Sequence, residues 1–187
     1  MSEPYWEPLG AQPIVEGRVK LWDSVDAGAT LGVPNLVTPV LPSNYRHLRV
    51  VGTLVASIAN NGGTLFRING DAATNRYFGT LSQFRASVSA GFNDCSGVAG
   101  LLIGNSSSFG EPIDLLIPNY ADVTAGIVKG IMCRKGYFGG ASANANYEQI
   151  TNGFWNLPAT VVQTLGFHNA GAANWVAGTR ITVYGES

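Results

Sequence analysis

The chain has few charged residues and few of the residue types that perform chemistry. Only 12% of its 187 residues are charged, and it has two cysteines and two histidines. The 11 basic residues are scattered along the chain and the formal net charge is −1. Because nucleic-acid binding needs a clustered positive surface, we expect no nucleic-acid partner. Because a metal site needs more convergent ligands than these, we expect no metal and no cofactor.

Long hydrophobic runs are also missing. No apolar stretch approaches the roughly 18 residues that span a bilayer, so we expect no membrane partner. The first eight residues carry neither the basic nor the apolar region of a secretory signal. In a reducing cytoplasm we therefore expect Cys95 and Cys133 to be buried free thiols, with a disulfide between them as the alternative.

Motifs with a known catalytic mechanism are missing as well. The chain has no phosphate-binding glycine loop, no zinc-protease motif and no nucleophile elbow. Glu111 and Asp114 are the candidate carboxylate pair for glycoside hydrolysis, but three residues apart on a strand they would point to opposite faces. His47 and His168 are expected to be structural. These observations predict that the chain has no catalytic residues and is not an enzyme.

What is present divides into two parts, an N-terminal arm at residues 1–20 and one domain at residues 21–187. Pro4, Pro8 and Pro13 disfavour a helix and favour an extended path for the arm. The arm also carries apolar side chains that we predict to be its interface residues: Tyr5, Trp6, Leu9, Ile14 and Val15. Two alternatives are open, an arm docked on its own domain and an arm docked on a neighbouring molecule.

The domain shows the two-residue alternation of β-strands. Ile181 and Val183 fall on one face of the last predicted strand, and Thr182 and Tyr184 on the other. Similar runs recur every eight to fifteen residues, separated by turn signals, and Asn60–Gly63 predicts a hairpin. We therefore predict an all-β fold, an antiparallel jelly-roll-like β-sandwich of about eight or nine strands.

Aromatic residues beside glycines allow two interpretations. Phe154 and Trp155 follow Gly153, and Tyr137 and Phe138 precede a Gly pair. We expect them to pack in the core or in an interface, and a carbohydrate-binding platform is the alternative.

Several phrases together resemble a β-domain of tailed-bacteriophage virion proteins. Their order and spacing carry the resemblance over about Trp22 to Gly185; the phrases are Tyr45–Gly52, Phe66–Asp71, Ile117–Asp122, Trp155–Asn156 and Val176–Gly185. The chain departs from the pattern at Asp71–Tyr77, where an extra Gly is expected. The resemblance implies a jelly-roll-like sandwich, a place in the virion and no catalysis.

Size and composition refine this expectation. The chain has no shaft, repeats or coiled-coil heptads, and its lightly charged surface suits close protein–protein packing. We therefore expect a capsid cement or decoration protein, made in the host cytoplasm, that binds the major capsid protein as a homotrimer and stabilises the shell. The alternatives are a tail-associated receptor-binding or adhesion module that binds a glycan, and a head–tail or baseplate component.

Overall fold

A computed structural model describes most of the chain. The residues described are 17–25, 28–57, 60–85, 88–94, 99–138, 146–170 and 173–187. They form strands, turns and loops with no helix among them, so the expected all-β sandwich class is confirmed. It follows that the described residues include no helix able to cross a membrane.

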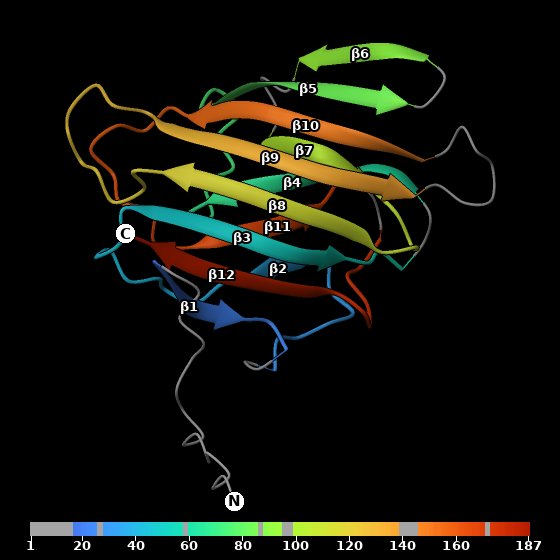
Figure 1. Cartoon of the computed structure of the whole chain (residues 1–187), viewed down its shortest axis with the longest axis horizontal. Coiled ribbons are helices and arrows are strands. Elements are labelled where there is room, and N and C mark those ends of the chain that lie inside the picture. The colour runs from blue at the N-terminus through green and yellow to red at the C-terminus, as the bar shows by residue number, and fades with distance from the viewer. Residues whose placement is uncertain are drawn as a thin grey trace, which may run out of the picture.

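Two antiparallel sheets form the sandwich (Figure 1). The large sheet has eight strands, in the order β1 (Arg18–Asp23), β12 (Arg180–Glu186), β3 (His47–Leu54), β8 (Glu111–Pro118), β9 (Lys129–Phe138), β10 (Asn146–Trp155), β5 (Tyr77–Arg85) and β6 (Val88–Asp94). The small sheet has four, in the order β2 (Asn35–Val37), β11 (Leu165–Asn169), β4 (Asn60–Ile68) and β7 (Leu101–Ser106). The twelve strands found in the described residues thus exceed the eight or nine expected.

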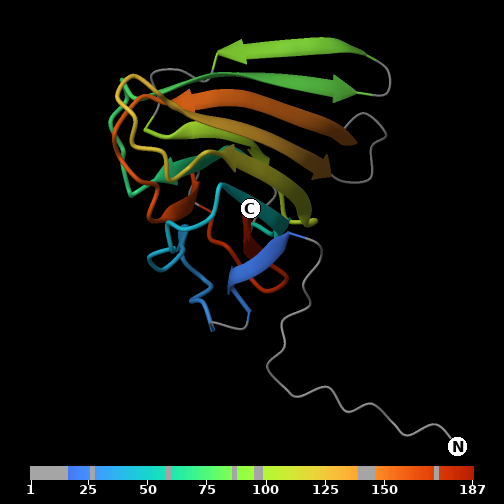
Figure 2. The same cartoon turned by 60° about the vertical axis from the view of Figure 1, so that its left-hand side comes forward.

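The additional strands extend one sheet. β5 pairs with β6, and β9 pairs with β10, and both hairpins belong to the large sheet. The remaining strands pair from the two ends of the chain inward, β1 with β12, β2 with β11, β3 with β8 and β4 with β7. Figures 1 and 2 show the small sheet behind the large one, with β6 at the far edge. These eight strands therefore form one long hairpin that is folded into two layers. The β5–β6 and β9–β10 hairpins are inserted into it and widen the large sheet.

The core lies between the layers because inward positions alternate along the strands. Ile181 and Val183 are fully buried, as the alternation predicted. On the small sheet, Phe66 and Phe167 are register partners whose ring centroids lie 5.4 Å apart at an interplanar angle of 54°. A tilted aromatic pair of this kind contributes about 0.5–1.5 kcal/mol beyond its buried area.

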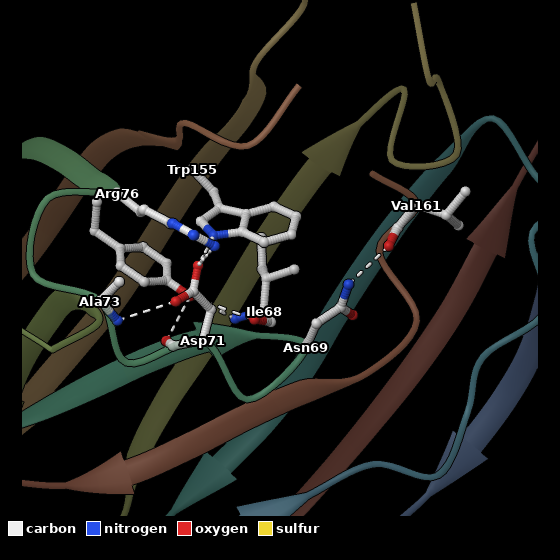
Figure 3. A network of polar contacts seen from close by, with 8 residues as sticks. Ile68, Asn69, Asp71, Ala73, Arg76, Trp155 and Val161 are labelled. Carbon is white, nitrogen blue, oxygen red and sulfur yellow. Dashed lines mark hydrogen bonds and ion pairs between the residues drawn. The ribbon is translucent and has the colours of Figure 1, made fainter. Parts of the chain in front are cut away.

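The corner between β4 and β5 is held by the side chain of Asp71 (Figure 3). Its carboxylate accepts hydrogen bonds from the indole Nε1 of Trp155 at 2.7 Å, from Nη1 of Arg76 at 3.2 Å and from the backbone N–H of Ala73 at 3.0 Å. The hydroxyl of Tyr77 donates to the Asp71 carbonyl at 3.0 Å. Burial alone would raise the pKa of Asp71, but these donors hold it below its ordinary value. The turn at Asp71–Tyr77 is therefore fixed to β10.

The turn residue Asn69 fixes a second segment to the same corner. Its φ of 53° is left-handed, a conformation that Asn tolerates. Its Nδ2 donates to the carbonyl of Val161 at 2.8 Å, and its Oδ1 accepts from the backbone N–H groups of Gln163 and Thr164 at 2.7 and 3.0 Å. The segment that leads into β11 is thereby positioned by Asn69, which with Gly70 forms the turn after β4.

One predicted turn differs from the structure. The hairpin predicted at Asn60–Gly63 is wrong, since β3 lies in the large sheet and β4 in the small sheet. Those residues begin β4, where register irregularities relative to β7 accommodate the glycines. At the other end of the described chain, β1 starts at Arg18, because residues 18–23 pair with the C-terminal strand.

Candidate binding surface on the large sheet

The outer face of the large sheet carries exposed apolar side chains and two ion pairs. It faces away from the small sheet and is formed by alternate side chains of neighbouring strands. We define it by the following residues: Arg49, Asp114, Leu116, Met132, Arg134, Glu148, Ile150, Asn152, Phe154, Phe78 and Phe84. Their direct neighbours in sequence point into the core, as Leu115, Cys133 and Trp155 do.

Two ion pairs cross this outer face. Arg49 on β3 meets Asp114 on β8 through two contacts, Nε to Oδ1 at 2.8 Å and Nη2 to Oδ2 at 2.5 Å. Arg134 on β9 pairs with Glu148 on β10. The hydrogen bond to Asp114 raises the pKa of Arg49, and that to Glu148 raises the pKa of Arg134. Each positive group is matched by a negative one, so a partner need not supply compensating charge.

Two shallow hollows, each of about 260 Å³, share Asp114 and Arg134. The first is also lined by Met132, Ile150 and Asn152. The second is also lined by Glu148 and Gly136. Both are lined by charged and apolar residues together, which is typical of binding surfaces.

Exposed apolar groups continue the outer face toward β5. Met132 is 45% exposed, Phe84 46% and Phe154 36%. Phe154 stacks on Phe78, its register partner on β5, with ring centroids 5.3 Å apart and an interplanar angle of 23°. Large apolar side chains gathered on one face with balanced charge indicate an interaction surface.

Another hollow, of about 390 Å³, lies at the opposite edge of the sandwich. It is lined by residues of β1, β2 and the segment between them, including Trp22, Ala29, Val33 and Leu36. β1 and β2 are the edge strands of their sheets. The predicted arm residues Tyr5, Trp6, Leu9, Ile14 and Val15 lie outside the described residues, so their docking on this edge or on a neighbour stays a prediction.

The structure places the other predicted residues in structural positions. His47 Nδ1 accepts the N–H of Asn119 at 3.2 Å, and His168 Nδ1 lies 2.6 Å from Oδ1 of Asn35. Burial lowers the pKa of His168 to about 4. Cys133 is buried as a free thiol, and burial raises its pKa to about 12, whereas Cys95 lies outside the described residues.

Among the residues described, no three His, Cys, Asp or Glu side chains come together in a way that could hold a metal ion. The carbohydrate platform proposed around Trp155 is not formed by that residue. Its side chain is fully buried and donates to Asp71, and Phe154 is the exposed member of the pair.

The outer face was not predicted from the sequence. The only signal was the alternation itself, because each buried position on β8, β9 and β10 implies an outward neighbour. Which of those outward neighbours lie side by side depends on the strand order. Asp114 and Ile150, 36 positions apart, and Arg49 and Arg134, 85 positions apart, line the same hollow.

No protein-family model matches the chain, and no curated protein matches its sequence.

Proposed function

We propose that the chain is a structural protein of a tailed-bacteriophage virion that binds the outer capsid surface as an oligomer, most simply a trimer, and stabilises the shell. The outer face carries this proposal. It combines exposed Met132, Phe84 and Phe154 with two internally matched ion pairs, Arg49–Asp114 and Arg134–Glu148. Such a face can be buried against another protein without leaving an unpaired charge.

The strand winding gives a second line of support. Without the two inserted hairpins, the large sheet reads β1-β12-β3-β8 and the small sheet β2-β11-β4-β7. This order supports a jelly roll, a fold used by many viral capsid proteins and also by lectins. Because one fold serves several functions, the strand order supports the proposal without distinguishing it from other functions. The residues of the outer face are therefore what an experiment has to test.

The proposal is tested by substituting a charge into the outer face. Met132→Glu places an unpaired carboxylate where the partner would exclude water, and we expect at least a tenfold loss of self-association and of capsid binding. Val123→Glu is the matched control, since Val123 is 51% exposed in a loop away from this face. Light scattering gives the oligomeric mass, and co-sedimentation with undecorated capsids gives the binding. Equal behaviour of both variants and the native chain would refute the role of the outer face.

Copy number separates capsid cement from a head–tail or baseplate part. A cement protein is present in numbers comparable to those of the major capsid protein, whereas a connector or baseplate part is present in few copies. Quantitative mass spectrometry of purified virions measures this ratio directly.

A second candidate function is glycan binding by a tail-associated adhesion module. The stacked Phe78 and Phe154 and the neighbouring amide of Asn152 favour it, because sugars pack on aromatic rings and bind through planar polar groups. Glycan-array binding that is lost in Phe154→Ala and retained in Phe109→Ala would favour this function over capsid binding. Phe109 is the matched control because it is 60% exposed outside the outer face.

A further inference from the structure

The open edges of the two sheets lie beside the same hollow. β1 is the first strand of the large sheet and β2 the first strand of the small sheet, so among the described strands each has a partner on one side only. The hollow of about 390 Å³ between them is lined by Trp22 of β1, by Leu36 of β2 and by residues of the intervening segment, Ala29 and Val33 among them. We call it the edge hollow. An unpaired strand edge beside an apolar hollow can accept an added strand whose side chains fill the hollow.

The backbone of β2 directs hydrogen-bonding groups toward its open side. The N–H of Thr38 donates to the carbonyl of Leu165 on β11 at 2.9 Å, so the N–H of Thr38 faces β11. Backbone groups in an antiparallel ladder alternate between the two sides of a strand, so those of Asn35 and Val37 face away from β11. They are the groups that a strand added at this edge would bind.

Exposed apolar side chains are frequent in the segments that form this edge. Val19 lies on β1 and Val37 on β2, and both are exposed, as are Val25, Leu31 and Val40 in the adjoining segments. Residues 19–40 thus hold five of the eleven large apolar side chains that are exposed in the described part of the chain. Water contact at so many apolar side chains is unfavourable, so this edge calls for an apolar segment that covers it.

Residues 1–16 have the composition and the position to be that segment. They include the apolar residues that the sequence predicts to form an interface, Trp6 and Leu9 among them, and they join β1 through Gly17. Gly17 lies in a turn and has a φ of 77°, a left-handed conformation that glycine adopts readily. A chain reversal at Gly17 returns the preceding residues along the open side of β1. Because they are tethered there, they reach the edge hollow at a higher effective concentration than a separate molecule does.

The length of this segment fits the path. Trp22 lies five residues after Gly17, so about five residues before Gly17 return along β1 at roughly 3.3 Å per residue. Residues 1–11 then remain to enter the edge hollow and to continue toward β2, and Leu9 and Trp6 are among them. The prolines of the segment are compatible with this path, because a strand at the edge of a sheet can lack the N–H on its outer side.

We infer that the edge hollow is the docking site for residues 1–16 of the same chain, which add to the open edge and place Trp6 and Leu9 in the hollow. One aromatic anchor cannot offset the entropy lost when such a segment is ordered, so the docked segment combines two apolar anchors with backbone hydrogen bonds to Asn35 and Val37. The docked segment would prevent strands of other molecules from pairing with β1 and β2. The outer face of the large sheet is a separate surface, so the inference does not depend on what that face binds.

Hydrogen exchange of the full chain, measured by NMR at single amides, tests the docking. The amide of Val37 should exchange at least about tenfold faster in the double variant Trp6→Ser, Leu9→Ser than in the native chain. The amide of Thr38, which is bound to β11, should exchange at the same rate in both. Phe109→Ser is the matched control, because it removes an exposed aromatic side chain outside this edge and should leave both rates unchanged. An equal rate at Val37 in the native chain and in the double variant would overturn the inference.

Photocrosslinking identifies where the segment docks and in which copy. Tyr5→p-benzoylphenylalanine leaves Trp6 and Leu9 in place, and the variant is refolded from an equal mixture of ordinary and nitrogen-15-labelled chains. The cross-link should join the tryptic peptides Met1–Arg18 and Leu21–Arg46, the second of which holds the residues lining the edge hollow, and both peptides should carry the same isotope. Cross-linked peptides of mixed isotope would show that the segment docks on another copy and would overturn docking within one chain. Cross-links to other peptides, or none, would overturn the site.

Discussion

Glu111 and Asp114 lie three residues apart on β8, and their carboxylates form ion pairs on opposite faces of the same sheet. Glu111 meets Lys135 at 2.5 Å in the interior, and Asp114 meets Arg49 at 2.5 Å on the outer face. The side chain of Glu111 has no exposure, whereas that of Asp114 is 42% exposed. Similar geometry therefore has different energetic consequences, because water screens one pair and is excluded from the other.

The buried carboxyl predicts a loss of stability as pH rises. Burial raises the pKa of Glu111 from 4.5 to about 7, so the folded state binds the proton more tightly than the unfolded state. The contribution of this group is fully present below pH 4.5 and is lost as pH rises through about 7. Urea denaturation between these pH values should show a decrease that Glu111→Gln flattens. An increase with pH that depends on Glu111 would contradict this prediction.

The exposed pair predicts a small coupling energy. A double-mutant cycle of Arg49→Ala and Asp114→Ala, measured by chemical denaturation, should give a coupling of about 1 kcal/mol or less. Both side chains are partly exposed, at 30% and 42%, so solvent screens their attraction. A coupling of several kcal/mol would mean that the pair is desolvated in the isolated protein, for example inside an oligomer.

Removing the carboxylate of Asp71 should have a larger effect on the free energy of unfolding. Asp71→Ala should destabilise the fold by about 2–4 kcal/mol, since it leaves the Trp155 indole and the Ala73 N–H without acceptors. Thermal or urea denaturation measures the change. Asp122→Ala is the control, because that partly exposed carboxylate accepts the N–H of Thr124 within its own loop and otherwise has only an electrostatic attraction to Lys129 among the described residues. Similar losses in both variants would show that the corner does not depend on the carboxylate.

Asp71 also predicts acid sensitivity. Its folded pKa is lower than the ordinary 3.8, so its contribution is present above pH 3.8 and is lost as pH falls through the folded value. The native chain should therefore lose stability in this acid range more steeply than Asp71→Asn. If the stability of the two proteins fell equally steeply in this acid range, the lowered pKa of Asp71 would be contradicted.

A pair of facing glycines predicts the cost of overpacking. Gly79 and Gly153 are register partners, and Leu101 of the small sheet packs against both. A Cβ at Gly153 would lie 2.7 Å from the Phe78 carbonyl and 2.7 Å from Leu101. Gly153→Ala should cost about 1–3 kcal/mol of stability. Gly130→Ala is the matched control on the adjacent strand, since its nearest neighbour would be Pro118 at 3.7 Å. Equal stability of the two variants would refute the close contact.

The sequence predicted which face of a strand is buried more accurately than which strands pair with each other. The alternation correctly placed Ile181 and Val183 on the buried face of their strand, and Glu111 and Asp114 were correctly placed on opposite faces. The hairpin at Asn60–Gly63 was wrong, because a turn signal describes local backbone preference and says nothing about which sheet receives the next strand.

The functional surfaces were less accessible to prediction. Residues 1–16, with the predicted arm contacts, lie outside the described residues. The outer face combines strands whose adjacency follows from the winding, and the buried pair of Lys135 and Glu111 combines two strands that no motif connects. Trp155 and Phe154 illustrate the difficulty, since the alternation separates them but does not say which one faces the core.

Composition and two-residue periodicity determined that this chain is an all-β sandwich with few charges and an apolar interior, because burial along a strand is a local property. Only the tertiary structure decided that β8, β9 and β10 lie side by side, that Arg49 meets Asp114, and that Lys135 meets Glu111 in the interior. Strand pairing brings together residues far apart in sequence, and its free energy comes from contacts that no local pattern encodes.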